Sequence, residues 1–386
     1  MHQQPSRVAV LGSTGSIGRS TLEVIAASAG RLQVVALSAH HNCAELEEQA
    51  RTLRPRWVVA TDEASASQHN WSLPSGTRLL TGSAALGEVA AADEVDVVVN
   101  AVVGSAGLES TWAALEAGKH VALANKETLV IAGPLVMQLV AERGGRLTPI
   151  DSEHSAILQA LAAGRRDEVR RIVLTASGGP FLRHSLAELE RVTLSEALHH
   201  PTWEMGKKIT IDSATMMNKA LEIIEARWLF DLRPEQIDVV IHPQSIVHSL
   251  VEFVDGSVLA QLSPPDMKLP IQYALTAPER RPSIAARLDL THAMRLDFEP
   301  PDPERFPALR LGSEVAAAGG TAGAVLNAAN EAAVERFIAG ELGFAEIVPA
   351  CREVLDHHDF IAQPTLAELL SADRWAREEV LRWICT

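Results

Sequence analysis

The first 150 residues alternate short aliphatic runs with amphipathic segments, and this alternation restricts the possible folds more than any other feature. The runs are rich in Val, Ala and Leu, and amphipathic helices are expected at 18–28 and 43–54. Near-continuous aliphatic strands separated by helices are typical of a parallel sheet buried on both faces. We therefore predict an α/β domain with a doubly wound parallel sheet over residues 1–150, with strands at 8–11, 34–37, 57–60, 95–99, 120–124 and 146–149.

The remaining chain is predicted to form an α+β domain (151–277), a linker and a small helical domain. The linker, 278–307, contains six prolines, which cannot continue a regular element for long. The helical domain, 308–386, contains helical patterns at 321–338 and 364–384, the second preceded by a capping box of Thr365 and Glu368. In the α+β domain we expect a long helix at 213–230 and strands at 171–175, 238–241, 249–253 and 258–262.

Composition excludes several classes of protein. The 386 residues include 49 acidic and 34 basic side chains, a net charge of −15, so a sequence-independent nucleic-acid binder is not expected. Cys43, Cys351 and Cys385 are odd in number and widely spaced, which favours neither a disulfide framework nor a thiolate zinc site. The first residues lack the apolar core of a signal peptide, and a cytoplasmic protein is expected.

A glycine-rich loop, Gly12-Ser13-Thr14-Gly15-Ser16-Ile17-Gly18, follows the first expected strand and opens the first helix. Backbone amides at a helix N-terminus in this position bind nucleotide phosphates, and the sheet is therefore predicted to be Rossmann-like. The alternative is an ordinary tight turn. The spacing Gly-x-x-Gly-x-x-Gly departs from the strict dinucleotide motif, and a Walker A loop is excluded because its Gly-Lys-Ser/Thr ending is missing.

The end of the second strand carries His40, His41 and Asn42 where NAD enzymes place an acid on the ribose hydroxyl. Histidines leave room for a 2′-phosphate and can partly neutralise it, so NADP is favoured over NAD. The alternative is a pair of exposed loop histidines with no ligand.

Two acidic segments can supply metal ligands. Asp151 and Glu153 flank Ser152 after the last strand of the first domain, and in an extended segment both carboxylates would point to one face. In the helix 213–230, the period places Asn218, Glu222 and Glu225 on one side, opposite a buried stripe of Met217, Leu221, Ile224 and Trp228. Carboxylates without cysteine indicate Mg²⁺ or Mn²⁺. The alternatives are a solvated acidic turn and helix acids paired with Lys219 or Arg227.

Two further segments combine small polar residues with glycine or basic residues. Ser177 precedes Gly178-Gly179-Pro180, where backbone amides can approach a phosphate. Residues 199–208 contain two histidines, Trp203, Gly206 and two lysines, a composition that suits a lid closing over an anion. Each segment taken alone can also be an ordinary turn.

Taken together, these motifs resemble those of the 1-deoxy-D-xylulose-5-phosphate reductoisomerase family. The resemblance covers residues 7–280 strongly, and Leu326-Asn327-Ala328-Ala329-Asn330-Glu331 extends it into the helical region. The matching segments, in order, are residues 12–18, Asn125-Lys126-Glu127, Asp151-Ser152-Glu153, residues 177–180, 200–206, 213–219 and 241–245.

The resemblance implies a homodimer that isomerises 1-deoxy-D-xylulose 5-phosphate and reduces the product with NADPH to 2-C-methyl-D-erythritol 4-phosphate. It implies that Asp151, Glu153 and Glu222 bind Mg²⁺ or Mn²⁺. The residues that would contact the substrate are Ser152, Glu153, Ser177, His200, Ser213, Asn218, Lys219 and Glu222. Those that would contact the cofactor are Thr14, Gly15, Ser16, Ile17, Asn125, Glu127 and Gly206, together with His40, His41 and Asn42. Lys126, Glu153 and Lys219 are the expected catalytic residues, Lys126 lying between cofactor and substrate and Glu153 or Lys219 moving the proton.

The sequence departs from the family pattern at two places, His40-His41 and Ala220, where the family often has a Gly-basic pair and a Gly. The first departure makes the strength of 2′-phosphate selectivity depend on histidine protonation.

Two other functions are alternatives: an NADP-linked semialdehyde or sugar dehydrogenase without isomerase activity, and a nucleotide-sensing module that has lost catalysis. The dehydrogenase needs no carboxylate metal site, and the sensor would not need to keep Lys126, Asp151, Glu153 and Lys219.

Overall fold

The structure, a computed structural model, describes residues 4–383, and Cys385 lies outside that range. The chain divides into two compact units, each assembled from separate stretches. Unit 1 comprises residues up to Thr128, Val136–Ser155 and Asp266–Ala286; unit 2 comprises Leu129–Leu135, Ala156–Pro265 and Arg287 onward. The division into three domains and a linker stays a prediction.

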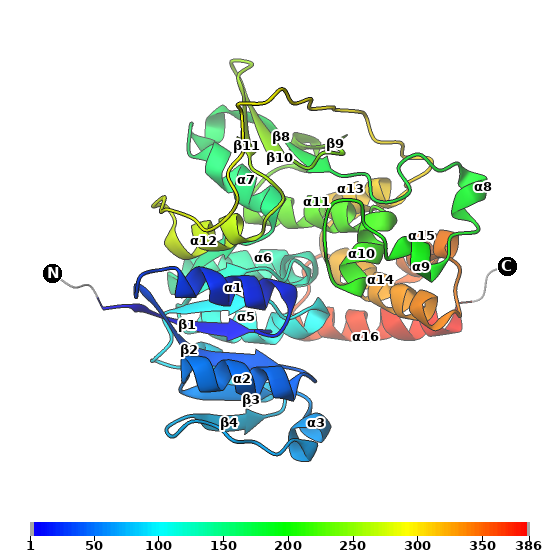
Figure 1. Ribbon diagram of the computed structural model, residues 1–386. Helices are drawn as coiled ribbons and strands as arrows, with labels where there is room; N and C mark the ends of the chain where they lie inside the picture. Colours follow the sequence, from blue (N-terminus) through cyan, green and yellow to red (C-terminus); the bar gives the residue numbers. More distant parts are fainter. Residues whose placement is uncertain (1–3, 384–386) are drawn as a thin grey trace. The chain divides into compact units, whose positions relative to one another are not determined.

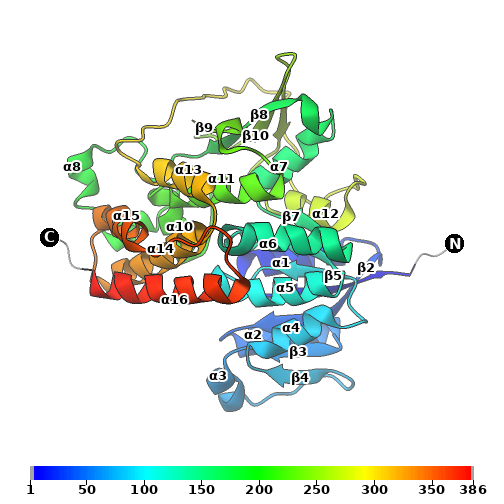
Figure 2. The ribbon, with the colours of Figure 1, turned by 180° about the vertical axis from the view of Figure 1, so that it is seen from behind.

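Unit 1 contains a seven-stranded parallel sheet in the order β4-β3-β2-β1-β5-β6-β7. Its strands are β1 (Ser6–Leu11), β2 (Leu32–Ala39), β3 (Trp57–Ala60), β4 (Arg78–Thr81), β5 (Val97–Asn100), β6 (His120–Leu123) and β7 (Arg146–Pro149). Helices α1 (Ser16–Ala26), α2 (Cys43–Leu53) and α12 (Lys268–Thr276) cover one face (Figure 1). Helices α4 (Ala84–Ala91) and α5 (Leu108–Glu116) cover the other (Figure 2), and α3 (Glu63–Gln68) follows β3.

This sheet confirms the predicted doubly wound α/β fold. The chain winds outward from β1 in both directions, so the strand order reverses between β1 and β5. Ligands of such sheets bind where the order reverses, at the carboxyl ends of the strands. Strand β4 was not predicted, because Arg78–Thr81 is exposed or half-buried and lacks the aliphatic run of its neighbours.

Unit 2 contains a mixed four-stranded sheet in the order β11-β10-β8-β9. Strands β8 (Val169–Ala176) and β9 (Ile237–Ile241) are parallel, whereas β10 (Val247–Phe253) is antiparallel to β8 and to β11 (Val258–Leu262). All four strands lie where the sequence predicted them. Short helices α8 (Leu186–Leu189) and α9 (Leu194–Ala197) follow β8.

The predicted long helix at 213–230 is wrong in its boundaries, because two helices occupy this region. Helix α10 (Lys207–Ala214) ends before Met216, which has a left-handed backbone (φ 63°), and α11 (Met217–Leu229) begins immediately after it. A non-glycine residue in this conformation is strained, and sequence periodicity does not reveal it. The predicted apolar stripe is confirmed for Met217, Leu221 and Ile224, which are buried, whereas Trp228 is only half-buried.

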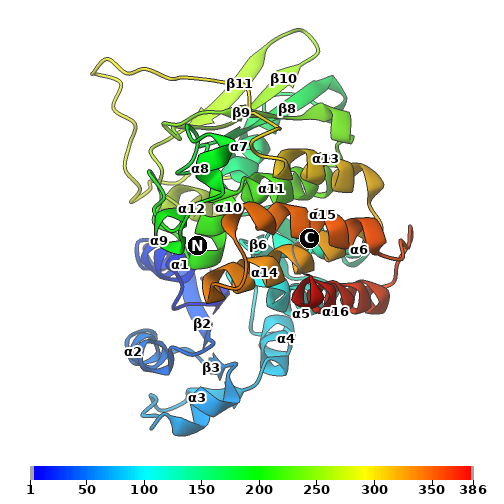
Figure 3. The same ribbon diagram turned by 90° about the vertical axis from the view of Figure 1, so that its right-hand side faces the viewer.

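The C-terminal helices of unit 2 pack on one another (Figure 3). They are α13 (Ala308–Ala318), α14 (Ala322–Ala339), α15 (Ile347–His357) and α16 (Leu366–Arg382). The capping box of α16 is present, with Thr365 and Glu368 each accepting from the other's backbone amide. Two elements contain residues from both units, α6 (Glu127–Arg143) and α7 (Ser152–Leu161). None of the helices among residues 4–383 is long and apolar enough to cross a membrane.

Candidate active site

The glycine-rich loop lies at the carboxyl end of β1 and leads into α1, as predicted. A Cβ on Gly18 would lie 2.3 Å from the Gly12 carbonyl oxygen, and one on Gly12 would lie 2.6 Å from that of Ala101. Both positions therefore require glycine. Helix α1 begins after Gly15 and, within residues 4–383, its N-terminus receives no side-chain cap, so its first amides are directed at the site where a phosphate would bind.

The second cofactor segment follows β2 and is exposed, with the His40 and His41 rings 3.8 Å apart. His40 Nδ1 lies 2.9 Å from Thr61 Oγ1, and His41 Nδ1 lies 3.0 Å from Asp62 Oδ2. Hydrogen bonds from the Ser65 hydroxyl and amide, and then from His41, lower the pKa of Asp62 to about 2. Asn42 caps α2, since its side chain accepts from the Glu45 amide. An acid thus does stand beside His41, contributed by the end of β3.

Asn125, Lys126 and Glu127 follow β6 and are all buried. The Asn125 amide donates to the carbonyls of Val102 and Gly104 (2.8 and 2.7 Å) and to Glu127 Oε2 (3.0 Å). Because the Asn125 side chain fastens the loop after β5, it shapes the end of the sheet from within.

The next acidic segment follows β7, and the premise that it is extended is wrong. Asp151 precedes α7, and Ser152 and Glu153 form the first turn of that helix. Lys126 Nζ donates to Asp151 Oδ2 (2.8 Å), while Asp151 Oδ1 accepts from His154 Nδ1 (3.1 Å) and the Glu153 amide (3.1 Å). Carboxylates are favoured at a helix N-terminus. The turn, rather than strand alternation, brings these groups together.

His154 was missed by the sequence reasoning. Its side chain is fully buried and bonded to Asp151, so it orients a candidate metal ligand. Its position three residues after Asp151 would have been a signal only if the segment had been recognised as a helix start.

In unit 2, Ser177 and His200 are brought together although they are 23 residues apart. His200 Nδ1 accepts from the amides of Thr202 (3.1 Å) and Trp203 (2.9 Å), which assigns the proton of the neutral ring to Nε2. Nε2 lies 3.0 Å from Ser177 Oγ, and the Gly179 amide donates to the same oxygen (3.2 Å). Both acceptor positions of the hydroxyl are therefore used, and its proton is directed elsewhere.

Burial lowers the pKa of His200, so the ring is neutral at pH 7. A neutral His200 that donates to Ser177 leaves the serine hydroxyl proton available to an anionic ligand. The glycines after Ser177 have left-handed backbones, with φ of 87° and 65°. This geometry permits the turn, and it suits an anion-binding loop.

Helices α10 and α11 position the remaining candidates. Ser213 lies in the last turn of α10, whose N-cap is Gly206. On α11, Glu222 accepts from Asn218 Nδ2 (2.5 Å) and from Lys219 Nζ. Lys219 and Glu222 are buried, so their pairing is not the exposed surface pairing considered as an alternative.

The donor chemistry of the candidate metal ligands fits a hard cation. Asp151, Glu153 and Glu222 offer only carboxylate oxygens, which Mg²⁺ and Mn²⁺ prefer. The glycine-rich loop likewise fits a nucleotide cofactor. The contacts at Gly12 and Gly18 leave room for no larger side chain, as expected where a backbone turn binds phosphates.

Comparisons with known proteins agree along the whole chain. Family models described as 1-deoxy-D-xylulose 5-phosphate reductoisomerase, its C-terminal domain and DXP reductoisomerase C-terminal domain match residues 8–133, 147–230 and 262–379. A protein named 1-deoxy-D-xylulose 5-phosphate reductoisomerase from Geobacter metallireducens is 53% identical to this chain, over 97% of each chain. One of the same name from Thermomicrobium roseum is 54% identical, over 96% of this chain and 95% of its own.

Solved structures give the same result. The reductoisomerase of Zymomonas mobilis in complex with NADPH has a TM-score of 0.90 and 44% identity, covering 98% of this chain and 99% of its own. A reductoisomerase in complex with NADPH, fosmidomycin and magnesium has a TM-score of 0.90 and 42% identity, with 98% of each chain covered.

Proposed function

This chain belongs to the 1-deoxy-D-xylulose 5-phosphate reductoisomerase family, and on that premise we propose which of its residues perform each part of the reaction. It is an oxidoreductase that converts 1-deoxy-D-xylulose 5-phosphate in isoprenoid biosynthesis, dependent on NADPH and a divalent metal. The single observation that best supports the residue assignment is that two candidate metal carboxylates each accept from a buried lysine, Asp151 from Lys126 and Glu222 from Lys219.

The cofactor binds along the carboxyl edge of the unit 1 sheet in this proposal. The α1 amides of Ser16 and Ile17, with Thr14 and Gly15, contact the pyrophosphate, and NADPH supplies the hydride when bound. His40, His41 and Asn42 face the 2′-phosphate. Asn125, Glu127 and Gly206 complete the contacts.

Asp151, Glu153 and Glu222 coordinate the metal, which when bound acts as a Lewis acid on substrate oxygens. Lys126 and His154 orient Asp151 through their hydrogen bonds, and Lys219 and Asn218 orient Glu222. Such partners fix the direction of ligand oxygens. The presence of this carboxylate set disfavours a plain NADP-linked semialdehyde or sugar dehydrogenase.

The substrate phosphate is bound by hydroxyl and basic groups of unit 2. Ser177 donates the proton left available by His200, and Ser213, Asn218 and Lys219 add donors. Contacts to the unreacting phosphate hold the sugar in register and convert binding energy into rate. Ser152 and Glu153 contact the sugar from the start of α7, and Glu153 or Lys219 moves the proton.

We propose a homodimer, which the edge of the unit 2 sheet supports. Strand β11 pairs with β10 on one side, and no strand among residues 4–383 pairs with its other side. Val258 and Leu259 on this edge are 52% and 40% exposed, whereas the opposite edge strand, β9, is bridged at Ile241 by Glu299. An apolar unpaired edge is a site for pairing with a second copy. Light scattering of Val258→Lys/Leu259→Lys against the unchanged protein tests this proposal.

We also propose that Mn²⁺ can serve in place of Mg²⁺. The enzyme is proposed to work in the cytoplasm. The decisive experiment follows NADPH consumption by its absorbance with 1-deoxy-D-xylulose 5-phosphate as substrate. Turnover should stop with a chelator and return with Mg²⁺ or Mn²⁺, whereas a chelator-resistant activity would contradict the metal proposal.

A further inference from the structure

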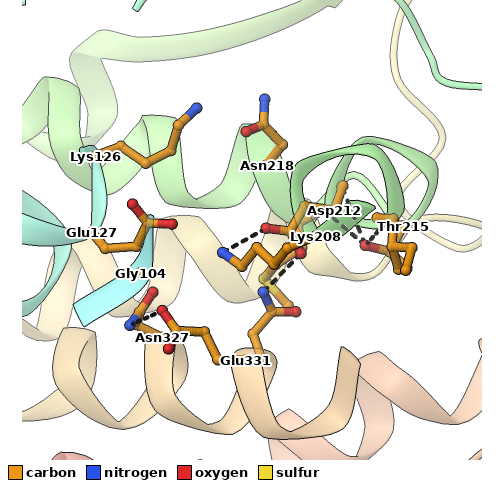
Figure 4. A network of polar contacts seen from close by, with 12 residues as sticks. Gly104, Lys126, Glu127, Lys208, Asp212, Thr215, Asn218, Asn327 and Glu331 are labelled. Atoms are coloured by element: carbon orange, nitrogen blue, oxygen red, sulfur yellow. Dashed lines mark hydrogen bonds and ion pairs between the residues drawn. The ribbon is translucent and has the colours of Figure 1, made fainter. Parts of the chain in front are cut away.

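The buried carboxylate of Asp212, which is not among the proposed site residues, connects the proposed substrate site to the C-terminal helices. Asp212 on α10 is 1% exposed. Its Oδ2 lies 2.8 Å from Lys208 Nζ, one turn earlier on α10, and its Oδ1 accepts from Asn330 Nδ2 of α14 at 2.9 Å. Figure 4 shows the pair of Lys208 and Asp212. A single carboxylate thus joins the two ends of α10 to a helix more than a hundred residues away.

Helix α10 determines where two substrate-binding segments lie. Ser213 is the residue after Asp212, and a Cβ on Gly179 would lie 2.7 Å from the Ser213 carbonyl oxygen. The loop containing Ser177 therefore packs directly on the end of α10. Any rotation of α10 about its axis would displace Ser213 and this loop together.

The orientation of Asn330 is set by Asp212. An ionised carboxylate only accepts hydrogen bonds, so the amide nitrogen of Asn330 must face it. Asn330 is fully buried, and its Oδ1 has no hydrogen-bond partner within residues 4–383. A buried acceptor without a partner is destabilising. The amide compensates for this acceptor with its hydrogen bond to the buried Asp212 carboxylate, so its clearest contribution is to hold that carboxylate in place.

We propose that Asp212 and Asn330 are positioning residues for the substrate phosphate: Asn330 fixes the Asp212 carboxylate, which fixes α10 and with it Ser213 and the Ser177 loop. The inference rests on the proposed role of Ser177 and Ser213. It assigns to α14 a part in substrate affinity, although Asn330 is not among the proposed substrate contacts.

Asn327 provides a matched control on the same helix. It is also fully buried, its Oδ1 also lacks a partner in the described part of the chain, and its Nδ2 donates to Glu331 Oε1 (3.0 Å) rather than to α10. Asn330→Leu and Asn327→Leu should therefore change the thermal midpoint similarly. Asn330→Leu alone should raise the KM for 1-deoxy-D-xylulose 5-phosphate about tenfold, equivalent to about 1.4 kcal/mol, with the KM for NADPH unchanged.

A charge swap separates positioning from packing. Asn330→Asp places two carboxylates opposite each other and should raise the substrate KM further. Asp212→Asn combined with Asn330→Asp restores an amide–carboxylate hydrogen bond but replaces the ion pair with Lys208 by an amide contact, so part of the affinity should return. Equal substrate KM values for the two leucine variants, or no recovery in the double variant, would overturn the proposal. Wild-type protein that fails to consume NADPH would instead contradict the proposed function.

Discussion

The candidate residues of the two units are positioned by different means. In unit 1 the site residues follow strand ends of one parallel sheet, and glycines at positions 12 and 18 are fixed by contacts with backbone atoms. In unit 2 the site residues come from a loop, a helix end and a second helix, and hydrogen bonds between side chains align them. Backbone geometry determines the glycine-rich loop of unit 1. A buried polar network determines the arrangement in unit 2, as it also does for Asp151 with Lys126 and His154 in unit 1.

This difference predicts where a substitution in the site should be tolerated. A sheet edge keeps its geometry when one side chain changes, because the strands on either side maintain it. A network of paired charges does not, because removing one member leaves another buried without its partner. We therefore expect substitutions among such paired groups to reduce turnover more than substitutions in the cofactor loops of unit 1.

The largest effect is expected for Glu222→Gln. The amide keeps the volume of Glu222 but removes the charge that pairs with Lys219 and is proposed to bind the metal. Turnover should fall by on the order of 10²–10³ or more, the loss typical of one preorganised electrostatic contact. NADPH binding, measured by fluorescence titration, should be unchanged. A fully active variant would remove Glu222 from the site and contradict the large effect on turnover expected for paired groups.

Much of unit 1 could be predicted from the sequence, and the reasons are physical. The period of aliphatic runs reports the sheet directly, and the glycine loop lies where the βαβ unit requires it. The exceptions are a tertiary contact and a misjudged turn. Asp62 reaches His41 from the N-cap of α3, and the turn at Asp151 is helical. In unit 2 the strands were predicted, but the left-handed turn at Met216 and the pairing of Ser177 with His200 have no local signal.

A smaller effect, confined to stability, is expected for a histidine of unit 1. His120 on β6 lies 3.0 Å from Thr148 Oγ1, and burial lowers its pKa to about 4. Between this value and the ordinary pKa of about 6.5 the unfolded chain binds more protons, so stability is full above pH 6.5 and is lost as the pH falls toward 4. The loss amounts to at most about 3 kcal/mol.

His120→Asn should therefore flatten the dependence of the urea midpoint on pH between about 7 and 5, with turnover at about pH 7.5 unchanged. His200→Asn is the counterpart in unit 2, because the pKa of His200 is also lowered by burial. It should raise the substrate KM as well, since Ser177 loses its donor. Similar kinetics for both variants would show that the two units do not differ in the way described.

A comparable test of the backbone in unit 1 is Gly18→Ala. The added Cβ would lie 2.3 Å from the Gly12 carbonyl oxygen and would push the loop away from the cofactor phosphates. NADPH affinity should weaken at least about tenfold, or about 1.4 kcal/mol. Gly87→Ala on α4 is the control, since its Cβ would meet only the Ala113 Cβ at 3.5 Å, an ordinary contact. Equal NADPH affinity in the two variants would contradict the proposed phosphate loop.

The smallest effect is expected at the exposed end of unit 1, where Asp62 accepts from His41. Asp62 is an anion throughout the neutral range because its pKa is about 2, so its charge opposes a bound 2′-phosphate. Asp62→Asn should strengthen NADPH binding a few-fold, because it removes this negative charge and leaves an amide oxygen that can still accept from His41. It also weakens the α3 cap, in which Ser65 donates to Asp62. His40→Gln is the comparison, because His40 contacts Thr61 instead of an acid. If NADPH affinity were the same for Asp62→Asn and the unchanged protein, then the charge beside His41 would not affect the cofactor, and this edge of the sheet would bind the nucleotide through its backbone alone.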